Sequence, residues 1–149
     1  MRSAHDSIEV TAAGRLEVVD LTDDLRAAVK DSGVTEGCVA VFCAHTTCTL
    51  ILNELEDGAL DDLRRRLDHL APADVYYGHD DLERRRQNLQ EGHERPNGRA
   101  HVMQMLLGGS SHVIPVIGGE PALGRWQRLL LLELDEPRER QVVFHAFGV

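Results

Sequence analysis

The feature that most constrains the fold is an apolar run between Gly37 and Ala44. Side chains alternate between the two faces of a β-strand, and in this run both faces are apolar. A strand of this kind is typically covered on both sides. It leads directly into His45, Thr46 and Thr47, so polar and titratable groups follow the end of a rigid element. The alternative is a buried strand followed by the cap of a helix.

The rest of the chain alternates between strand and helix patterns. Two short strands, 7–11 and 16–19, are expected to form a hairpin around a turn at 12–15. Three helices are expected: Thr22 to Gly33, one carrying Leu60, Leu63, Leu67 and Leu70 and ending at Ala71-Pro72, and 98–107 after an N-cap at Asn97. Strands are expected at 111–117, 126–135 and 141–145, with Pro115 indicating an edge or a bulge. The polar stretch 73–96 has little periodicity and is interpreted as a functional loop.

Composition excludes several classes of function. The 149 residues fit one domain, 1–149, and the net charge of −9 argues against binding nucleic acid through its phosphates. No apolar run approaches the roughly 18–20 residues of a membrane helix, and residues 1–6 lack the apolar region of a signal peptide. We therefore expect a cytoplasmic protein that uses neither nucleic acid nor membrane. Lys30 is the only lysine, so a Schiff-base mechanism is close to excluded.

The three cysteines, Cys38, Cys43 and Cys48, are spaced five residues apart. This spacing matches neither a disulfide framework nor a structural zinc site. We interpret them as small buried apolar residues in a reducing compartment, with Cys43 and Cys48 packing around His45.

Three of the eight histidines are candidate site residues: His45 after the apolar strand, His79 in the polar loop and His101 on the third helix. Together with Glu54 or Glu133 they would form a divalent-metal or acid–base cluster. No short metal-binding motif is present, so only the fold can bring them together. The other five are interpreted as surface or packing residues: His5, His69, His93, His112 and His145.

Further polar positions have two interpretations each. Ser110, after two glycines, offers an anion site or a turn into a strand. Gln127 and Glu133 are six positions apart, so their side chains point to the same face of the expected strand. They would flank the mouth of a pocket, or they would lie at the ends of a core strand. Asn53 and Glu54 would serve a site or cap the second helix.

An ordered series of motifs resembles one known family. The motifs are His45-Thr46-Thr47, Asn53-Glu54, Asn97 with Ala100-His101, Gly108 with Ser110, Ile114-Pro115-Val116, Leu123-Gly124-x-Trp126-Gln127, Glu133-Leu134-Asp135 and Pro137-Arg138-x-Arg140. The series is similar to that of the YjbQ family, from about residue 8 to residue 143. Many members carry an acidic pair before the Ala-His, where this chain has Asn97-Gly98-Arg99. We interpret that difference as a trait of a subfamily.

The resemblance implies an α+β fold with a β-sandwich-like core of mainly antiparallel strands, about three helices, and a homotrimer. Some family members are named secondary thiamine-phosphate synthases, which implies a transferase acting on small phosphorylated substrates. The alternative is a non-catalytic homotrimer that binds a metal or small ligand. Expected catalytic residues are His45, Glu54, Asn97 and His101; expected substrate-binding residues are Thr46, Thr47, Asn53, Ser110, Gln127 and Arg138; and expected ligands of Mg²⁺ or Zn²⁺ are His45, His79, His101 and Glu133.

Overall fold

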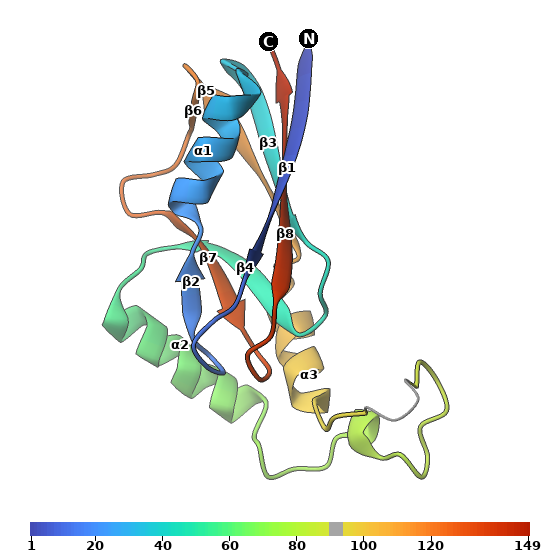
Figure 1. Ribbon diagram of the computed structural model, residues 1–149. Coiled ribbons are helices and arrows are strands. Elements are labelled where there is room, and N and C mark those ends of the chain that lie inside the picture. The colour runs from blue at the N-terminus through green and yellow to red at the C-terminus, as the bar shows by residue number, and fades with distance from the viewer. Residues whose placement is uncertain (90–93) are drawn as a thin grey trace.

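The structure is a computed structural model that describes residues 1–89 and 94–149 (Figure 1). His93, predicted to be a surface or packing residue, lies outside the described residues. The elements in chain order are β1 (Arg2–Val10), β2 (Val18–Asp20), α1 (Thr22–Ser32), β3 (Glu36–Cys43), β4 (Cys48–Asn53), α2 (Asp57–Leu70), the 3-10 turn η1 (Gly78–Asp80), α3 (Gly98–Leu107), β5 (Ser111–Ile117), β6 (Glu120–Pro121), β7 (Arg128–Glu133) and β8 (Arg140–Gly148).

The strands form two antiparallel sheets. One sheet has the order β1-β8-β3-β5-β6 and the other has the order β2-β7-β4. The predicted central strand is β3, which lies between β8 and β5. With three α-helices beside the sheets, the structure confirms the predicted α+β class (Figure 1).

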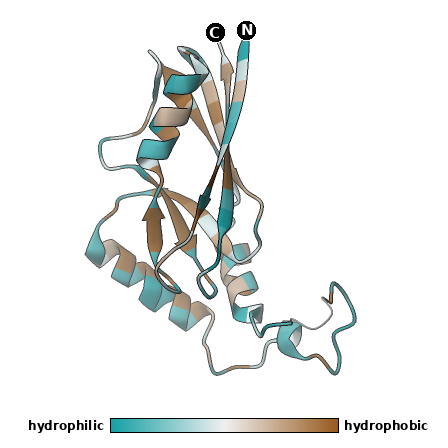
Figure 2. Ribbon diagram, viewed as in Figure 1, coloured by the Kyte–Doolittle hydropathy of each residue, from teal (hydrophilic) through white to brown (hydrophobic). Residues whose placement is uncertain are grey.

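The main core fills the space between the two sheets and α1. Val41 and Phe144 from the larger sheet, Leu50 and Leu131 from the smaller sheet, and Leu25 from α1 are all buried in it. A second cluster, which includes Leu67, Met103 and Leu132, packs α2 and α3 against the other side of the smaller sheet. Apolar colour accordingly concentrates on the strands, whereas α2 alternates between polar and apolar residues (Figure 2).

The predicted hairpin of the first two strands is wrong. β1 pairs with β8, and β2 pairs with β7, so residues 12–15 pass from one sheet to the other. Leu16, at φ +60°, turns the chain there and its N–H donates to the carbonyl of Glu133 at 2.7 Å. Alternation identified the strands, but long-range packing chose their partners.

The structure covers β3 on one side only. Val39, Val41 and Cys43 are buried, whereas Phe42 on the opposite face is 46% exposed. The same face also carries the polar residues Ser111 and His145 among further exposed apolar side chains. We call this surface the outer sheet face; its large exposed apolar residues are Phe42, Val113, Ile117 and Phe147. No layer of the described residues covers it, so residues 1–89 and 94–149 do not supply the expected second cover.

The helix ends follow local signals. Thr22 begins α1 instead of capping it, and its N–H donates to the Asp20 carboxylate at 2.9 Å. Glu56 caps α2 by accepting from the N–H groups of Gly58 and Ala59. The predicted bounds of α3 are confirmed, with Gly108 in the left-handed conformation after it.

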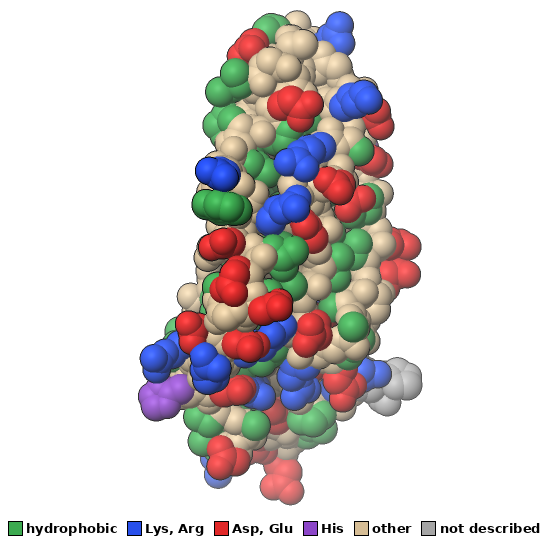
Figure 3. Space-filling view, turned by 90° about the vertical axis from the view of Figure 1, so that its left-hand side faces the viewer, with side chains coloured by type: hydrophobic (Ala, Val, Ile, Leu, Met, Phe, Trp, Pro, Cys, Tyr) green, Lys and Arg blue, Asp and Glu red, His purple; other side chains and the backbone are tan. Residues whose placement is uncertain are grey.

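The helix-bearing side of the molecule is covered by interspersed acidic and basic side chains (Figure 3). No helix in the described part of the chain has the length and apolar character needed to cross a membrane.

Candidate functional site

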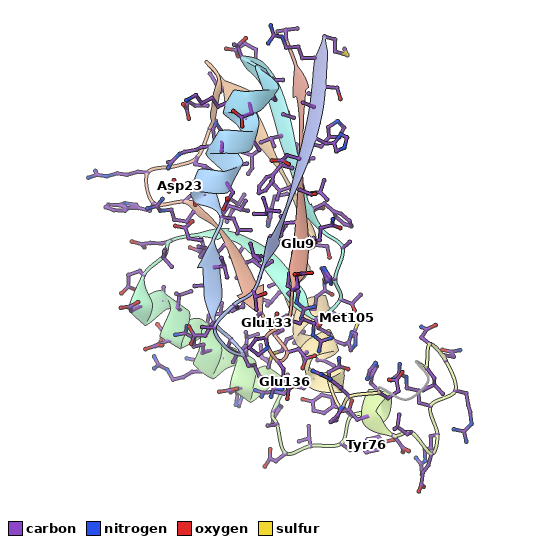
Figure 4. The ribbon with its side chains drawn as sticks, viewed as in Figure 1. Glu9, Asp23, Tyr76, Met105, Glu133 and Glu136 are labelled. Carbon is purple, nitrogen blue, oxygen red and sulfur yellow. The ribbon has the colours of Figure 1, made fainter. Side chains whose placement is uncertain are left out.

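A cavity of about 840 Å³ lies beside α3, at the end of the sheets where β3 leads into β4. Its wall combines the β3–β4 loop, the segment between α2 and α3, α3 itself and the β7–β8 loop. Met105, one of its lining residues, is labelled at the lower end of the sheets in Figure 4. The lining residues are Thr46, His79, Arg85, Asn88, Glu94, Arg95, Asn97, His101, Met105, Pro137 and Arg138.

The two histidines of this cavity lie against each other. The ring centroids of His79 and His101 are 4.4 Å apart, with the ring planes inclined at 41°. Asp80 holds this arrangement: its Oδ1 accepts from the N–H of Gly98 at 2.8 Å, at the start of α3, and lies 3.3 Å from Nδ1 of His79. The 3-10 turn is thereby fixed to the first turn of the helix that carries His101.

His101 favours its neutral form. Burial is the main cause of its lowered pKa, followed by the charge of a protonated His79, with Arg85 adding to the effect. Asp135 and the backbone of Thr46 oppose the shift. A neutral imidazole has one donor and one acceptor nitrogen, which suits hydrogen bonding or proton transfer to a bound molecule.

Arg138 brings a cation to the cavity wall. One of its terminal nitrogens donates to the buried carboxylate of Asp135, which also accepts from Nδ2 of Asn97 at 3.2 Å. Arg15 reaches the same carboxylate at 3.7 Å. Among the described residues the Nε of Arg138 is buried and has no hydrogen-bond partner. Unpaired buried donors are rare and call for an explanation, and an acceptor on a bound ligand would supply one.

The cavity is basic within an acidic chain. Arg85, Arg95 and Arg138 line it, and Glu94 is the only carboxylate among its described lining residues. Arg85 donates to Glu94 at 2.8 Å and to the carbonyl of His79 at 3.2 Å. Arg95 pairs with Glu136 at 3.1 Å, so each of the three guanidinium groups already has a carboxylate partner. Three guanidinium groups around one cavity of a chain with a net charge of −9 still favour an anionic ligand.

His45 lies near the cavity but is not among its lining residues. Its Nε2 accepts from the backbone N–H of Gln141 at 3.0 Å, so the neutral ring carries its proton on Nδ1. Burial lowers its pKa, and the charges of Arg140 and Arg138 lower it further, whereas Glu133 opposes them. This hydrogen bond holds the ring of His45 in one tautomer. It favours a structural role, in which His45 positions the β3–β4 loop.

Glu133 does not join the histidines. Its side chain is fully buried and both its oxygens accept from Arg140, at 2.8 and 2.5 Å. Arg140 also donates to Oγ1 of Thr47 at 3.0 Å, so Thr47 serves this buried pair. The described residues contain no group of three or more His, Cys, Asp or Glu arranged for a metal ion. They do not fit the predicted metal centre, and a divalent ion would need ligands from elsewhere.

Three of the predicted site residues lie at the opposite end of the smaller sheet. Cys48 pairs with Glu133 at one end of β4 and β7, whereas Asn53 pairs with Arg128 at the other. Five residue steps along a strand separate the two ends by roughly 17 Å. Asn53 is at that far end, and Glu54 and Gln127 line a second hollow of about 700 Å³ beside the exposed Trp126. In one chain they cannot act together with His101.

Ser110 is also outside the cavity. Its hydroxyl accepts from Nε2 of Gln104 at 2.8 Å, and its backbone N–H donates to the carbonyl of Gly108. Its carbonyl in turn accepts from the N–H of Cys43 at 2.9 Å. These bonds favour the interpretation of a turn leading into β5 over that of an anion site.

The cavity therefore contains five of the predicted residues: Thr46, His79, Asn97, His101 and Arg138. Arg85, Glu94 and Arg95 were not among the predicted site residues, although the polar stretch that holds them was predicted to be functional. Asp135 and Arg140, the buried partners of Arg138 and Glu133, could be identified in the sequence only as members of the motif series.

The two antiparallel sheets, with a histidine-lined and arginine-rich cavity at one end, place the chain in a class of small α+β proteins. The chain matches the family described as "UPF0047 protein YjbQ-like" over residues 6–149. It belongs to the YjbQ family, as the motif series predicted.

The relatives agree with this placement. A UPF0047 protein of Archaeoglobus fulgidus is 37% identical over 139 residues, covering 93% of this chain and 98% of the relative. The UPF0047 protein YugU of Bacillus subtilis is 31% identical over 143 residues, covering 95% and 98%. A crystal structure of a YbjQ-like protein of unknown function from Sulfolobus solfataricus P2 superposes with a TM-score of 0.85 at 30% identity, covering 99% of both chains.

Proposed function

We propose that the cavity binds a small phosphorylated molecule and that His101 forms a hydrogen bond to its phosphate or exchanges a proton with it. The observation that carries this proposal is Arg138, whose buried Nε has no partner among the described residues and which lines the same cavity as the His79–His101 pair. Guanidinium groups match the geometry of phosphate oxygens and bind them through paired hydrogen bonds. A volume of about 840 Å³ falls within the usual range for small-molecule sites.

The activity we propose is thiamine-phosphate synthase-like transfer. A bond forms between the thiazole nitrogen and the methylene carbon of the pyrimidine diphosphate, while the carbon–oxygen bond to the diphosphate breaks. The departing diphosphate takes the electron pair, so catalysis consists of stabilising its growing negative charge. Arg138 and Arg95 supply positive charge, and a neutral His101 donates one hydrogen bond. Mg²⁺ and Zn²⁺ enter the proposal as assay variables, because the described residues hold no group of three or more His, Cys, Asp or Glu arranged for a metal ion.

Non-catalytic ligand binding is the second candidate function. It is favoured by the separation of Glu54 and Gln127 from His101 along the length of β4 and β7. With those groups absent from the cavity, one chain has the means to bind an anion but fewer groups to act on it.

We also propose that copies of this chain assemble, as a homotrimer, through the outer sheet face. Phe42 and Val113 are 46% and 65% exposed on that face, and Ile117 and Phe147 extend it. Contiguous exposed apolar surface on a sheet marks a binding interface. A second copy is the favoured occupant because the two-sided apolar pattern of β3 matches a strand that is covered on both sides.

The experiment combines binding with turnover. Calorimetry with inorganic pyrophosphate measures binding, and formation of thiamine phosphate from the two phosphorylated precursors, with and without Mg²⁺, measures catalysis. We expect His101→Gln to lower turnover by about 100-fold or more, within the range for an acid–base group. His69→Gln, at the exposed end of α2, is the matched control. Binding without turnover would select the second candidate function, and no binding by the folded protein would refute both.

A further inference from the structure

Two thiols meet at the base of the loop that carries His45. The Sγ atoms of Cys43 and Cys48 are 3.3 Å apart, and both side chains are 1% exposed. Both are free thiols, and the expectation of small buried residues is confirmed for these two, whereas Cys38 is only half-buried. Their closeness goes beyond what packing alone requires.

The backbone fixes this arrangement. Cys43 is the last residue of β3 and its N–H donates to the carbonyl of Ser110 at 2.9 Å, whereas Cys48 is the first residue of β4 and pairs with Glu133. The carbonyl of Thr47 accepts from the N–H of Leu134 at 3.1 Å. Both sulfurs are thus attached to strands of different sheets, and closing from 3.3 Å to a bond of about 2.05 Å requires a movement of about 1.3 Å.

We infer that Cys43 and Cys48 form a peroxide-oxidisable dithiol, which closes to a disulfide that joins the two sheets at the base of the His45–Thr47 loop. The chemical class of oxidant is a small hydroperoxide, since a buried pair excludes bulky disulfides such as oxidised glutathione. The inference is independent of the proposed phosphate site.

The surroundings of the two thiols indicate which one attacks the peroxide and which one resolves the sulfenic acid. The hydrogen bond with Cys48 lowers the pKa of Cys43, and the backbone of His45 and the charge of Arg140 act in the same direction against burial. The same hydrogen bond and burial raise the pKa of Cys48. The thiolate is the nucleophile in sulfur chemistry, so Cys43 attacks first and Cys48 resolves.

The two steps balance. The Cys43 thiolate attacks one peroxide oxygen, the O–O bond breaks, Cys43 becomes a sulfenic acid, and the hydroxide released takes up a proton to form water. The sulfur of Cys48 then attacks the sulfur of Cys43, the S–S bond forms, the S–O bond breaks, and a second water leaves. In total, one hydrogen peroxide takes two electrons from two thiols and yields one disulfide and two waters.

The test treats the intact protein with hydrogen peroxide, removes the excess with catalase, and alkylates the remaining thiols in urea before mass analysis. We expect wild type to lose two alkylatable thiols and to yield one intrachain link between the peptides of Cys43 and Cys48, reversed by dithiothreitol. Cys38→Ser should behave like wild type, because Cys38 lies on the opposite face of β3. Cys48→Ser should stop at a sulfenic acid on Cys43, trapped by dimedone.

Two results would overturn the inference. One is that Cys43 and Cys48 of the wild type remain fully alkylatable after peroxide has oxidised Cys38. The other is that the only disulfide formed links the Cys38 residues of two chains. Dimedone labelling of Cys48 in Cys43→Ser, without labelling of Cys43 in Cys48→Ser, would overturn the assignment of roles. The wild-type measurement decides the main point even where a serine variant fails to fold.

Discussion

Arg140 and Glu133 form a bidentate ion pair inside the protein, with Nε–Oε2 and Nη2–Oε1 distances of 2.8 and 2.5 Å and side chains 2% and 0% exposed. Arg140 is the first residue of β8 and Glu133 the last of β7, so the pair connects the two sheets. It also holds the β3–β4 loop, because Arg140 donates to the hydroxyl and the carbonyl of Thr47.

Breaking this pair should be costly. Arg140→Met leaves a buried carboxylate without its partner, and we expect the free energy of unfolding to fall by about 3–5 kcal/mol. Urea denaturation followed by circular dichroism measures the change. The double variant Glu133→Leu/Arg140→Met removes both charges and should recover much of the loss. Equal losses in the single and double variants would contradict the buried-pair explanation.

The sequence predicted local structure well because local signals are strong. Gly33 and Gly108 ended helices as expected, and the bounds of α3 and β5 agree with the predictions. Alternation could not reveal that β1 and β2 lie in different sheets, because strand pairing is a property of the whole fold.

The site was predictable only in part. His79 and His101 are 22 positions apart in sequence and meet because Asp80 is bonded to the start of α3. Glu133 looked like a metal ligand because no sequence pattern shows that Arg140 occupies both its oxygens. Glu54 follows His45 closely in sequence, yet a whole strand separates them.

Acid should destabilise the fold through His101 and His45. Both have a pKa below the ordinary value of 6.5, so the unfolded chain takes up protons on them at a higher pH than the folded chain does. Their contribution to stability is complete above pH 6.5 and is lost as the pH falls from that value through the lower pKa values of the folded state. Denaturation midpoints across this range should drop less in His45→Gln/His101→Gln than in wild type, and His69→Gln should follow wild type. Parallel curves for wild type and the double variant would rule out this cause.

Arg138 should control the affinity for anions. Removing a hydrogen bond to a charged group costs about 1.5–3 kcal/mol, so Arg138→Met should raise the Kd for pyrophosphate by about 10-fold to 100-fold. Arg138→Lys keeps the charge but loses the planar guanidinium group, so its Kd for pyrophosphate should lie between those of wild type and Arg138→Met. Arg66→Met, on the exposed face of α2, provides a control for net charge. Calorimetry at fixed ionic strength makes the comparison, and equal affinities of Arg138→Met and Arg66→Met would refute the role of Arg138.

The outer sheet face should determine assembly. Phe42→Asp places a carboxylate on that face, at the end where β3 leads into β4, and desolvating an unpaired charge in an interface is unfavourable. We expect sedimentation equilibrium to show a trimer for wild type and a monomer for the variant, with the circular dichroism spectrum preserved. Leu70→Asp, at the exposed end of α2, should remain trimeric. A wild-type monomer at all concentrations would refute the assembly proposal.

Gly98 should be needed to keep the histidine pair in place. A Cβ at this position would lie 2.8 Å from Cβ of Tyr77, 3.0 Å from Cβ of His79 and 3.1 Å from Oδ1 of Asp80. Gly98→Ala must therefore push η1 away from α3, and overpacking of this kind costs about 1–3 kcal/mol. Gly14→Ala, where the new methyl group meets only Cγ of Glu17 at 3.5 Å, is the matched control. Because the same movement separates His79 from His101, Gly98→Ala should also weaken pyrophosphate binding, measured by calorimetry. Unchanged stability and binding in Gly98→Ala would show that the close approach of η1 to α3 does not position the pair.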